Sequence, residues 1–273
     1  MMFGRNFGAT VASSDRWVGK GVPAAHTAAR AHAARGRFGA RTGLGMSIQA
    51  RSSGLQLIVD DSLRGTLALG VLEAEGANTQ GLPPAFEQER DRLVGRLVSH
   101  YAGKQPADIP GVTETRALFH RLDIDPTKTR PSSEALLRRV LQGKGLPRVN
   151  AVVDVCNLCS LEHQLPLGLY DRDLVKGGLR VRVGRDSEGY AGIRKQWVNL
   201  AGRLLLADDD GPFGAPTADS RRTSVSAETR NLLVVVFSPP ERAGGHLSAA
   251  LERIADLLTR HCGASVTAVR VLQ

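Results

Sequence analysis

The stretch RPSSEALLRRVLQGKGLPRVNAVVDVCNLCSLEHQLPLGLYD, residues 130–171, predicts two helices joined by a Gly/Pro turn. The second helix, over residues 149–163, is apolar on nearly every side, which is typical of a buried helix. Its remaining polar line consists of Asn150, Asp154 and Asn157, spaced at i, i+4 and i+7. Because buried polar groups need partners, we expect either a structural polar network, the more common case, or the wall of a site.

The first helix of the stretch begins near Ser132, where a serine is expected to cap the free amide groups and Glu134 to lie in the first turn. Basic side chains gather around this helix: Arg130, Arg138, Arg139 and Lys144. Exposed arginines on helices are ordinary, so a solvated face is the simple interpretation. The alternative is that these four residues contact the phosphates of an RNA.

Cys156 and Cys159 form a C-x-x-C pair, and His163 follows one turn later. A zinc site would need a fourth ligand, and Cys262 is the only other thiol in the chain. A redox site would need the first cysteine exposed near a helix start, whereas Cys156 lies in mid-helix on an apolar face. We therefore expect thiols that pack in the core and no metal, with the other two interpretations as alternatives.

The rest of the chain alternates irregularly between strands and helices. Strands are expected at residues 55–60, 65–72, 179–183, 203–207, 232–237 and 266–272. Helices are expected at residues 86–101, 112–122 and 247–262, the last ended by Gly263. Residues 165–171 are expected as a turn leading into Tyr170. This order predicts an α/β fold with a mixed β-sheet in packed layers.

Residues 211–223 are rich in Gly, Pro, Ser and Thr, so they are expected as a long loop, which is more often functional than a short one. Asp219, Ser220, Arg221 and Thr223 offer hydrogen-bond donors and acceptors within five positions. No nucleophile elbow is present, so a catalytic triad is not supported. The preceding run Asp208–Asp210 invites a divalent metal, but Asp-Gly after a strand is first a turn signal.

The net charge of +9 is concentrated in one part of the 273-residue chain. Residues 1–46 hold seven basic residues and one acidic residue, a net +6, and the remainder carries only +3. The basic segment has no sustained periodicity and is expected to be a disordered arm, an organelle transit peptide, or sequence upstream of a true start at Met46, which we favour. Residues 47–273 are then expected to form a single domain.

Three cysteines in a chain of this length argue against a disulfide scaffold and favour a reducing compartment, so a cytoplasmic location is expected. No run of 18 apolar residues predicts a membrane span. Aromatic residues are only 4% of the chain, which argues against binding of single-stranded RNA by base stacking. Contacts with the shape and phosphates of a double-stranded RNA are compatible with this composition.

The stretch at residues 130–171 resembles the B3/B4 domain of the phenylalanyl-tRNA synthetase β chain, and more closely the free-standing proteins made of that domain alone. A second block, DDDGPFGAPTADSRRTSVSAET at residues 208–229, fits the same proteins, and the resemblance spans about residues 55–271. In the synthetase this domain binds a mischarged amino acid on tRNA and hydrolyses it off. The resemblance implies a three-layer sandwich, with tRNA and an amino acid moiety as the ligands.

The resemblance also implies a pocket where the two blocks meet. Its expected walls are Asn150, Asp154, Asn157 and Ser160, facing Ser220 and Arg221, with Asp219 and Thr223 as candidates for holding a catalytic water. Two positions depart from the synthetase pattern, which has a His where this chain has Gly168 and a Glu near Leu233. Both of those residues are implicated in editing by the synthetase, so their absence argues against an identical mechanism.

Three functions remain open from the sequence. The first is a trans-editing hydrolase that removes a wrong amino acid from tRNA through a positioned water and amides that hold the oxyanion. The second is a module that binds an amino acid or an RNA end without chemistry, and the third is a structural partner of another protein. No ATP-binding motif is visible, so ligase activity is rejected, and no cofactor is expected.

Overall fold

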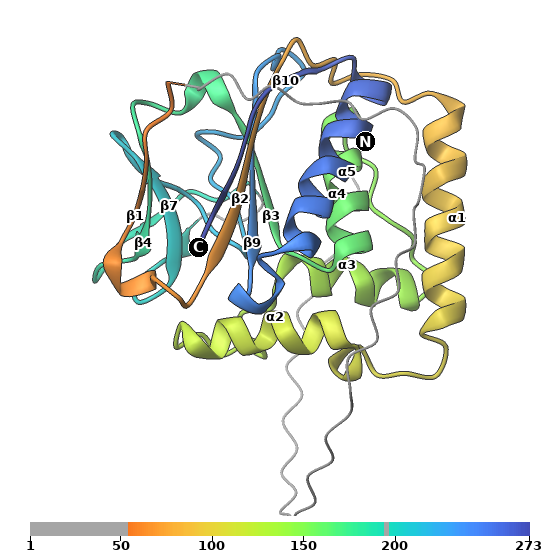
Figure 1. Ribbon diagram of the computed structural model, residues 1–273, viewed down its shortest axis with the longest axis horizontal. Helices are drawn as coiled ribbons and strands as arrows, with labels where there is room; N and C mark the ends of the chain where they lie inside the picture. Colours follow the sequence, from red (N-terminus) through yellow and green to blue (C-terminus); the bar gives the residue numbers. More distant parts are fainter. Residues whose placement is uncertain (1–53, 194–196) are drawn as a thin grey trace, which may run out of the picture. The chain divides into compact units, whose positions relative to one another are not determined.

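The computed structural model describes residues 54–193 and 197–273. The basic segment predicted at residues 1–46 lies outside the described residues, and the single domain at 47–273 stays a prediction. Within the described ranges, the main strands form two four-stranded sheets, ordered β1-β4-β7-β8 and β10-β2-β9-β3, and a two-stranded sheet, β5-β6 (Figure 1). No described helix is both long and apolar enough to cross a membrane.

The strands are β1 (Leu57–Val59), β2 (Ala68–Glu75), β3 (Leu167–Asp171), β4 (Leu179–Val183), β5 (Gly189–Tyr190), β6 (Val198–Asn199), β7 (Leu204–Asp208), β8 (Gly211–Gly214), β9 (Leu232–Ser238) and β10 (Ser265–Leu272). The α-helices are α1 (Pro84–His100), α2 (Pro110–Arg121), α3 (Ser132–Leu141), α4 (Ala151–His163) and α5 (Gly245–Cys262). Short 3-10 turns connect several of them.

The central layer is the antiparallel sheet β10-β2-β9-β3. Every residue of β9 is buried, because α4 and α5 cover one face of this sheet and the second sheet covers the other (Figure 1). A strand covered on both faces reads as a continuous apolar run instead of an alternating one, which explains LLVVVFS. The helices α4 and α5, the central sheet and the second sheet therefore form three layers, which confirms the layered α/β prediction.

The outer sheet is mixed, as predicted, because β1 runs parallel to β4 while β4–β7 and β7–β8 are antiparallel. The space between the two sheets is filled by large side chains from both, including Tyr170 of β3, Phe213 of β8 and Phe237 of β9. This inter-sheet core and the core beneath α4 and α5 lie on opposite faces of the central sheet. The edge strand β3 therefore borders both.

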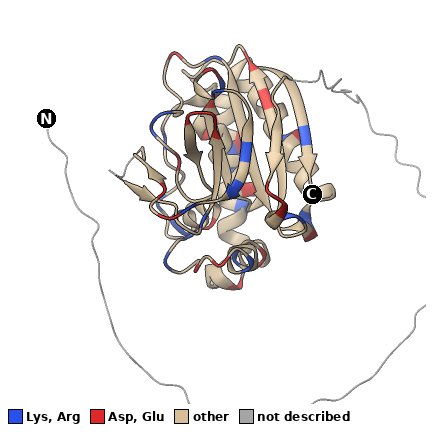
Figure 2. Ribbon diagram, turned by 90° about the vertical axis from the view of Figure 1, so that its left-hand side faces the viewer, with Lys and Arg blue, Asp and Glu red and all other residues tan. Residues whose placement is uncertain are grey.

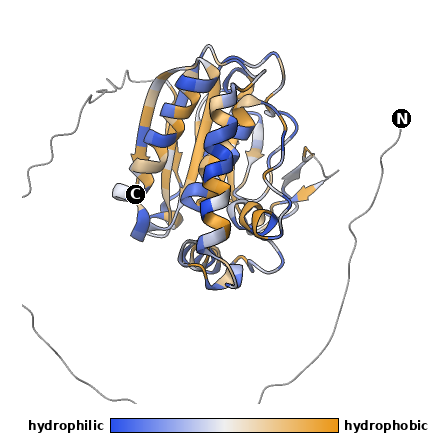
Figure 3. Cartoon of the chain, turned by 90° about the vertical axis from the view of Figure 1, so that its right-hand side faces the viewer, coloured by the Kyte–Doolittle hydropathy of each residue, from blue (hydrophilic) through white to orange (hydrophobic). Residues whose placement is uncertain are grey.

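Helix α4 is buried along most of its length, as the all-round apolar pattern indicates, whereas α1 lies outside it and is mainly polar (Figures 1 and 3). Asn150 occupies the N-cap of α4, and its side chain accepts a hydrogen bond from the amide of Val153 at 2.9 Å. Helix α5 ends at Gly263, whose φ of 65° confirms the predicted left-handed C-cap.

Three local predictions were wrong. The first residue of α3 is Ser132 itself, so Pro131 occupies the cap position and no serine side chain caps the helix. Residues 167–171 form strand β3 instead of a turn, because they pair along their whole length with β9. The first four residues of the expected loop at 211–223 form strand β8, which pairs with β7.

Candidate functional site

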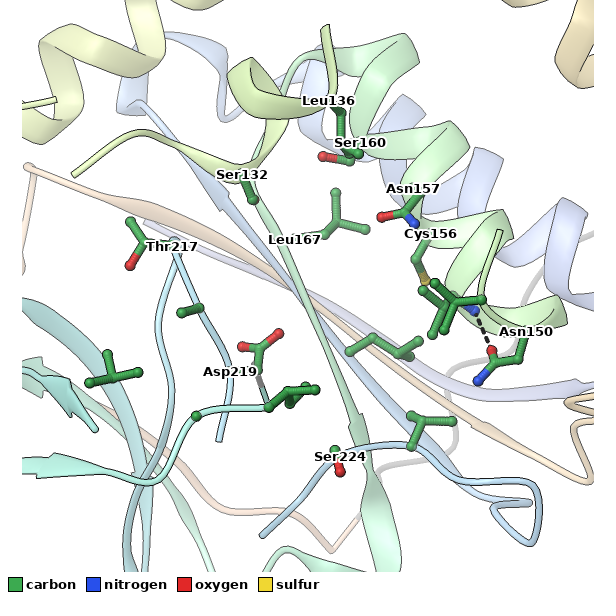
Figure 4. Close-up of a pocket in the computed structure, with 18 residues that line it drawn as sticks. Ser132, Leu136, Asn150, Cys156, Asn157, Ser160, Leu167, Thr217, Asp219 and Ser224 are labelled. Carbon is green, nitrogen blue, oxygen red and sulfur yellow. Dashed lines mark hydrogen bonds between the residues drawn. The ribbon is translucent and has the colours of Figure 1, made fainter. Parts of the chain in front are cut away.

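A pocket of about 450 Å³ opens beside the edge strand β3. Its walls come from the start of α3, one face of α4, strand β3, residues Gly192 and Ile193, and the loop at residues 215–225 (Figure 4). Sites for small molecules usually have volumes of about 300–1,000 Å³ and are lined by apolar side chains with a few polar groups. The lining here has that composition, with Leu167, Leu169 and Val225 beside Ser132, Thr217 and Ser224.

Helix α4 contributes a stripe of side chains to the pocket: Asn150, Val153, Asn157 and Ser160. Their spacing of three and four residues places them on one face of the helix. The hydroxyl of Ser160 donates to the carbonyl of Leu165 at 2.8 Å, while the side chain of Asn157 points into the cavity (Figure 4). Three of the four residues predicted on this helix therefore line one pocket.

The loop opposite α4 is held in place by hydrogen bonds to its main chain. The amide of Ser220 donates to the carbonyl of Phe213 at 2.9 Å, and the amide of Ile193 donates to the carbonyl of Asp219 at 3.3 Å. The phenol of Tyr190, on β5, donates to the carbonyl of Ala218. A loop fixed at several points can hold its side chains in a set orientation towards a ligand.

Asp219 extends from this loop into the pocket (Figure 4). The phenol of Tyr170 donates to its Oδ1 at 2.7 Å, and the amide of Ala215 also donates to the carboxyl. Among the lining residues that the structure describes, Asp219 alone carries a formal charge. Burial raises the pKa of Asp219 to about 7, and the two hydrogen bonds offset only part of that increase. The carboxyl can therefore exchange a proton near neutral pH.

Four predicted site residues lie away from the pocket lining, and two of them, Asp154 and Thr223, support its walls. Asp154 accepts a hydrogen bond from the amide of Val149 at 2.8 Å and pairs with Arg148 at 3.2 Å, so its side chain stabilises the N-terminus of α4. Thr223 is fully buried, and its carbonyl accepts from the amide of Asp171 at 2.9 Å. Asp154 and Thr223 thus hold the walls of the pocket from outside.

Ser220 and Arg221 follow Asp219 directly but leave the pocket. Ser220 is buried, and its hydroxyl accepts from the amide of Arg222 at 3.0 Å. Arg221 is exposed, and its main chain is anchored to the carbonyl of Ala191 at 2.9 Å. Their contribution in this structure is to fix the loop that carries Asp219.

Tyr170 is the main feature of the site that the sequence did not indicate. It was expected in a turn, where its side chain would have had no defined direction. The alternation in LGLYD was the available signal, since on a strand Leu167 and Leu169 face one side and Gly168 and Tyr170 the other. In the structure the two leucines line the pocket, while Tyr170 reaches Asp219 from the inter-sheet core.

The predicted basic cluster surrounds a buried carboxylate. Glu134, whose side chain is 1% exposed, pairs with Arg116 and Arg138 at 2.7 Å each and with Arg130 at 3.6 Å. Arg139 and Lys144 are exposed, and neither has an ion pair within the part of the chain that the structure describes. Figure 2 shows basic and acidic segments interleaved elsewhere on the molecule. The local excess of positive charge beside α3 is therefore reduced by Glu134.

The cysteines and the aspartate run occupy structural positions. Cys156 and Cys159 are buried free thiols, and burial raises the pKa of both, which disfavours the reactive thiolate. Asp208 is buried and accepts two hydrogen bonds from the guanidinium of Arg222. Within residues 54–193 and 197–273, no group of three or more His, Cys, Asp or Glu side chains is arranged to hold a metal ion.

The two positions that depart from the synthetase pattern both lie on the inter-sheet side of the central sheet. Gly168 sits two residues before Tyr170 on β3, and a Cβ at this position would overlap the phenol. Leu233 pairs with Tyr170 in the register of β3 and β9 and is fully buried between the sheets. In this chain, Tyr170 and apolar packing fill the region in which the synthetase pattern places a His and a Glu.

Comparisons with known proteins agree with the resemblance. The phenylalanine–tRNA ligase β subunit of Bartonella quintana is 33% identical over 122 residues, which are 44% of this chain and 15% of that subunit. The β subunit of Synechococcus sp. (strain CC9605) is 31% identical over 152 residues, 50% of this chain and 18% of that subunit. The matched segments thus span less than a fifth of these relatives.

A crystal structure of an N-terminal fragment of the phenylalanyl-tRNA synthetase β-subunit from Pyrococcus horikoshii aligns over 80% of this chain and 52% of that chain. The alignment has a TM-score of 0.44 and 14% sequence identity. The model of the B3/4 domain family matches residues 114–263, which include α4, β3, Asp219 and the whole lining of the pocket from Ser132 to Val225. Since that match covers more than half of the sequence, the chain belongs to the B3/4 domain family.

Proposed function

We propose that this protein is an aminoacyl-tRNA deacylase that acts in trans, removing a wrong amino acid from tRNA in the cytoplasm without any aminoacylation activity. The observation that carries the proposal is Asp219, a half-buried carboxyl of raised pKa that points into a pocket of ligand size. The similarity of the surrounding segments to phenylalanine–tRNA ligase β subunits supports tRNA as the carrier of the substrate.

The proposed reaction is hydrolysis of the ester that joins the amino acid to the terminal ribose. Asp219 takes a proton from a water, whose oxygen attacks the ester carbonyl carbon; the bond to the ribose oxygen then breaks, and Asp219 returns the proton to that oxygen. A general base works best when its pKa lies near the working pH, which suits a pKa of about 7. The N-terminus of α4, at Asn150 and Val153, borders the pocket and favours the developing negative charge.

In this proposal Asn150, Asn157 and Ser160 form the binding wall, and the amino acid lies between them and Asp219. Asp154, Thr223, Ser220 and Arg221 act indirectly, by holding α4 and the loop. Because Ser132 and Leu136 line the pocket from α3, basic residues on the same helix are near its rim. We propose that Arg139 and Lys144, with help from Arg130 and Arg138, contact phosphates of the acceptor stem.

A second candidate is a module that binds an amino acid or a tRNA end without chemistry. The observation that favours it is the filling of the inter-sheet region by Tyr170 and Leu233, in place of the polar residues of the synthetase pattern. This candidate needs the same pocket but assigns Asp219 the role of a hydrogen-bond acceptor. The two candidates therefore differ in what happens to a bound ester, and not in where it binds.

The test is incubation of the full chain with a panel of mischarged tRNAs, following release of the amino acid. We expect release from one class of amino acid, a loss of at least about 100-fold with Asp219→Ala, and retained binding of a non-hydrolysable amide analogue. Asp186→Ala removes an exposed carboxylate from a turn and serves as the matched control with unchanged activity. Binding without release from any substrate would reject the deacylase and support the second candidate.

A further inference from the structure

Tyr170 is a fully buried phenol at the junction of the inter-sheet core and the pocket. Its ring packs edge-to-face against Phe213, with centroids 4.8 Å apart and an interplanar angle of 87°. Its hydroxyl leaves this apolar layer only to reach Oδ1 of Asp219 at 2.7 Å. The phenol therefore approaches the carboxyl from behind, on the side away from the pocket.

Two glycines make this approach possible. A Cβ on Gly168, of the same strand, or on Gly214, at the end of β8, would overlap the hydroxyl of Tyr170. Neither glycine has a positive φ, so the backbone conformation does not demand glycine at either position. The requirement comes from the space that the phenol occupies, because both neighbours lack a side chain where its hydroxyl passes.

We propose that Tyr170 is a positioning residue for Asp219: its hydroxyl, admitted by Gly168 and Gly214, fixes the rotation of the carboxyl so that the group faces the pocket. This inference rests on the proposed function and deepens it, because it assigns the orientation of the base to a residue outside the pocket lining. The bond has a further consequence for the charge of Asp219. A donor to the ionised carboxyl favours that form and lowers its pKa, opposing the effect of burial.

The titratable groups around Asp219 come from three elements: Tyr170 on β3, Tyr190 on β5 and Cys156 on α4 across the pocket. Burial raises the pKa of all three, so all are neutral at pH 7. Only Tyr170 donates a side-chain hydrogen bond to the carboxyl among the described residues. Its removal is therefore expected to leave Asp219 protonated up to a higher pH.

The chain offers a matched pair of variants, Tyr170→Phe and Tyr190→Phe. Each removes one phenolic oxygen from a buried tyrosine beside the loop, but the hydroxyl of Tyr190 donates to the main-chain carbonyl of Ala218. We expect Tyr170→Phe to shift the rising limb of the pH–rate profile upwards by about one pH unit and to lower kcat/KM at pH 7 about tenfold. Tyr190→Phe is expected to leave the midpoint of that limb unchanged.

A second measurement keeps the inference testable without turnover. A ¹³C NMR titration of the side-chain carboxyls, with Asp219 assigned by its loss in Asp219→Asn, reports the same midpoint directly. We expect an upward shift in Tyr170→Phe, and the same direction in Gly168→Ala, which displaces the phenol. A midpoint that is unchanged in a folded Tyr170→Phe variant would overturn the inference. If the midpoint shifts in Tyr170→Phe but the wild-type chain shows no deacylation, only the proposed reaction is rejected.

Discussion

Two regions that border the same pocket each hold a carboxyl group wholly or partly away from water, and they do so in opposite ways. In the first turn of α3, Glu134 is surrounded by the guanidinium groups of Arg116, Arg130 and Arg138. In the loop at 215–225, Asp219 receives hydrogen bonds from a phenol and a main-chain amide. The first environment is rich in positive charge, and the second supplies only neutral donors.

The pKa values of the two carboxyls differ accordingly. Burial alone would raise the pKa of Glu134, but the hydrogen bonds from Arg116 and Arg138 outweigh it and the net shift is downwards. For Asp219 burial prevails, and the pKa rises to about 7. A buried carboxyl with cationic partners stays ionised and holds elements together, whereas one with neutral partners is poised to exchange a proton. Glu134 therefore stabilises the fold around α3, whereas the raised pKa of Asp219 supports its proposed role as a base.

The largest effect on stability is expected from Glu134→Ala. This change leaves three arginines facing one another without their shared carboxylate, and removal of one partner from a buried charge cluster is strongly destabilising. Because the arginines are partly exposed, we expect a loss of about 2–3 kcal/mol in the free energy of unfolding, measured by urea denaturation at pH 7. Glu228→Ala, at an exposed site, is the control. Equal stability of the two variants would mean that Glu134 stabilises the fold no more than an exposed carboxylate does.

Asp219→Asn is expected to raise the free energy of unfolding, whereas Glu134→Ala lowers it. The folded-state pKa of about 7 lies above the ordinary value of 3.8, so the fold favours the neutral carboxyl, and stability is lost as the pH rises from about 4 to about 7. After discounting for partial exposure, the neutral amide should increase the free energy of unfolding at pH 8 by about 1–2 kcal/mol. Urea denaturation at pH 8 and pH 5 checks this, since the gain should shrink at pH 5. A loss at pH 8 would mean that the ionised carboxyl stabilises the fold.

The pH dependence of the Glu134 cluster follows from its lowered pKa. A depressed carboxyl contributes stability that is fully present above its unfolded pKa, about 4.5, and is lost as the pH falls through the lower folded value. The difference in unfolding free energy between wild type and Glu134→Gln should therefore be constant from pH 6 to 8. It should shrink by about 1 kcal/mol as the pH falls from 5 to 3. A difference that grows in this acid range would contradict the assignment.

The smallest effect is expected on tRNA binding, from an exposed arginine of α3 near the rim of the pocket. Arg139 is exposed and has no ion pair among the described residues, whereas Arg138 pairs with Glu134. We therefore expect Arg139→Ala to weaken tRNA binding several-fold and to reduce the slope of log K against log salt by just under one, as for one phosphate contact. The exposed Arg185, in a turn after β4, provides a control variant, Arg185→Ala. If Arg139→Ala leaves both affinity and slope unchanged, the cluster is only a solvated surface.

Much of the fold could be predicted because its elements carry strong local patterns. The apolar run of β9 and the all-round apolar character of α4 indicate burial on both sides, and they lie at the centre of the three layers. The strand β3 was not predicted, since an edge strand of five residues depends on pairing with β9, whose partner residues lie 61 to 69 positions further along the chain. Pairing across such distances leaves little trace in local composition.

The site was predicted in part for a similar reason. Asn150, Asn157 and Ser160 share a helical face and could be grouped from their spacing alone. Asp154 also fits that spacing approximately, but the nearby Arg148 and the amide of Val149 hold its carboxylate at the helix start. The link between Asp219 and Tyr170 joins residues 49 positions apart through a gap left by two glycines, and only the packed sheets reveal it.

The contrast between the two carboxyls can be measured by a ¹³C NMR titration of the side-chain carboxyls in the wild-type chain, with Glu134 and Asp219 assigned by substitution. One experiment then compares the two carboxyls under identical conditions. We expect Asp219 to titrate with a midpoint of about 7 and Glu134 to titrate below its ordinary value of 4.5. A midpoint near 4 for Asp219 would contradict this expectation, because the pocket would then hold an ordinary ionised carboxylate and not a base poised near neutral pH.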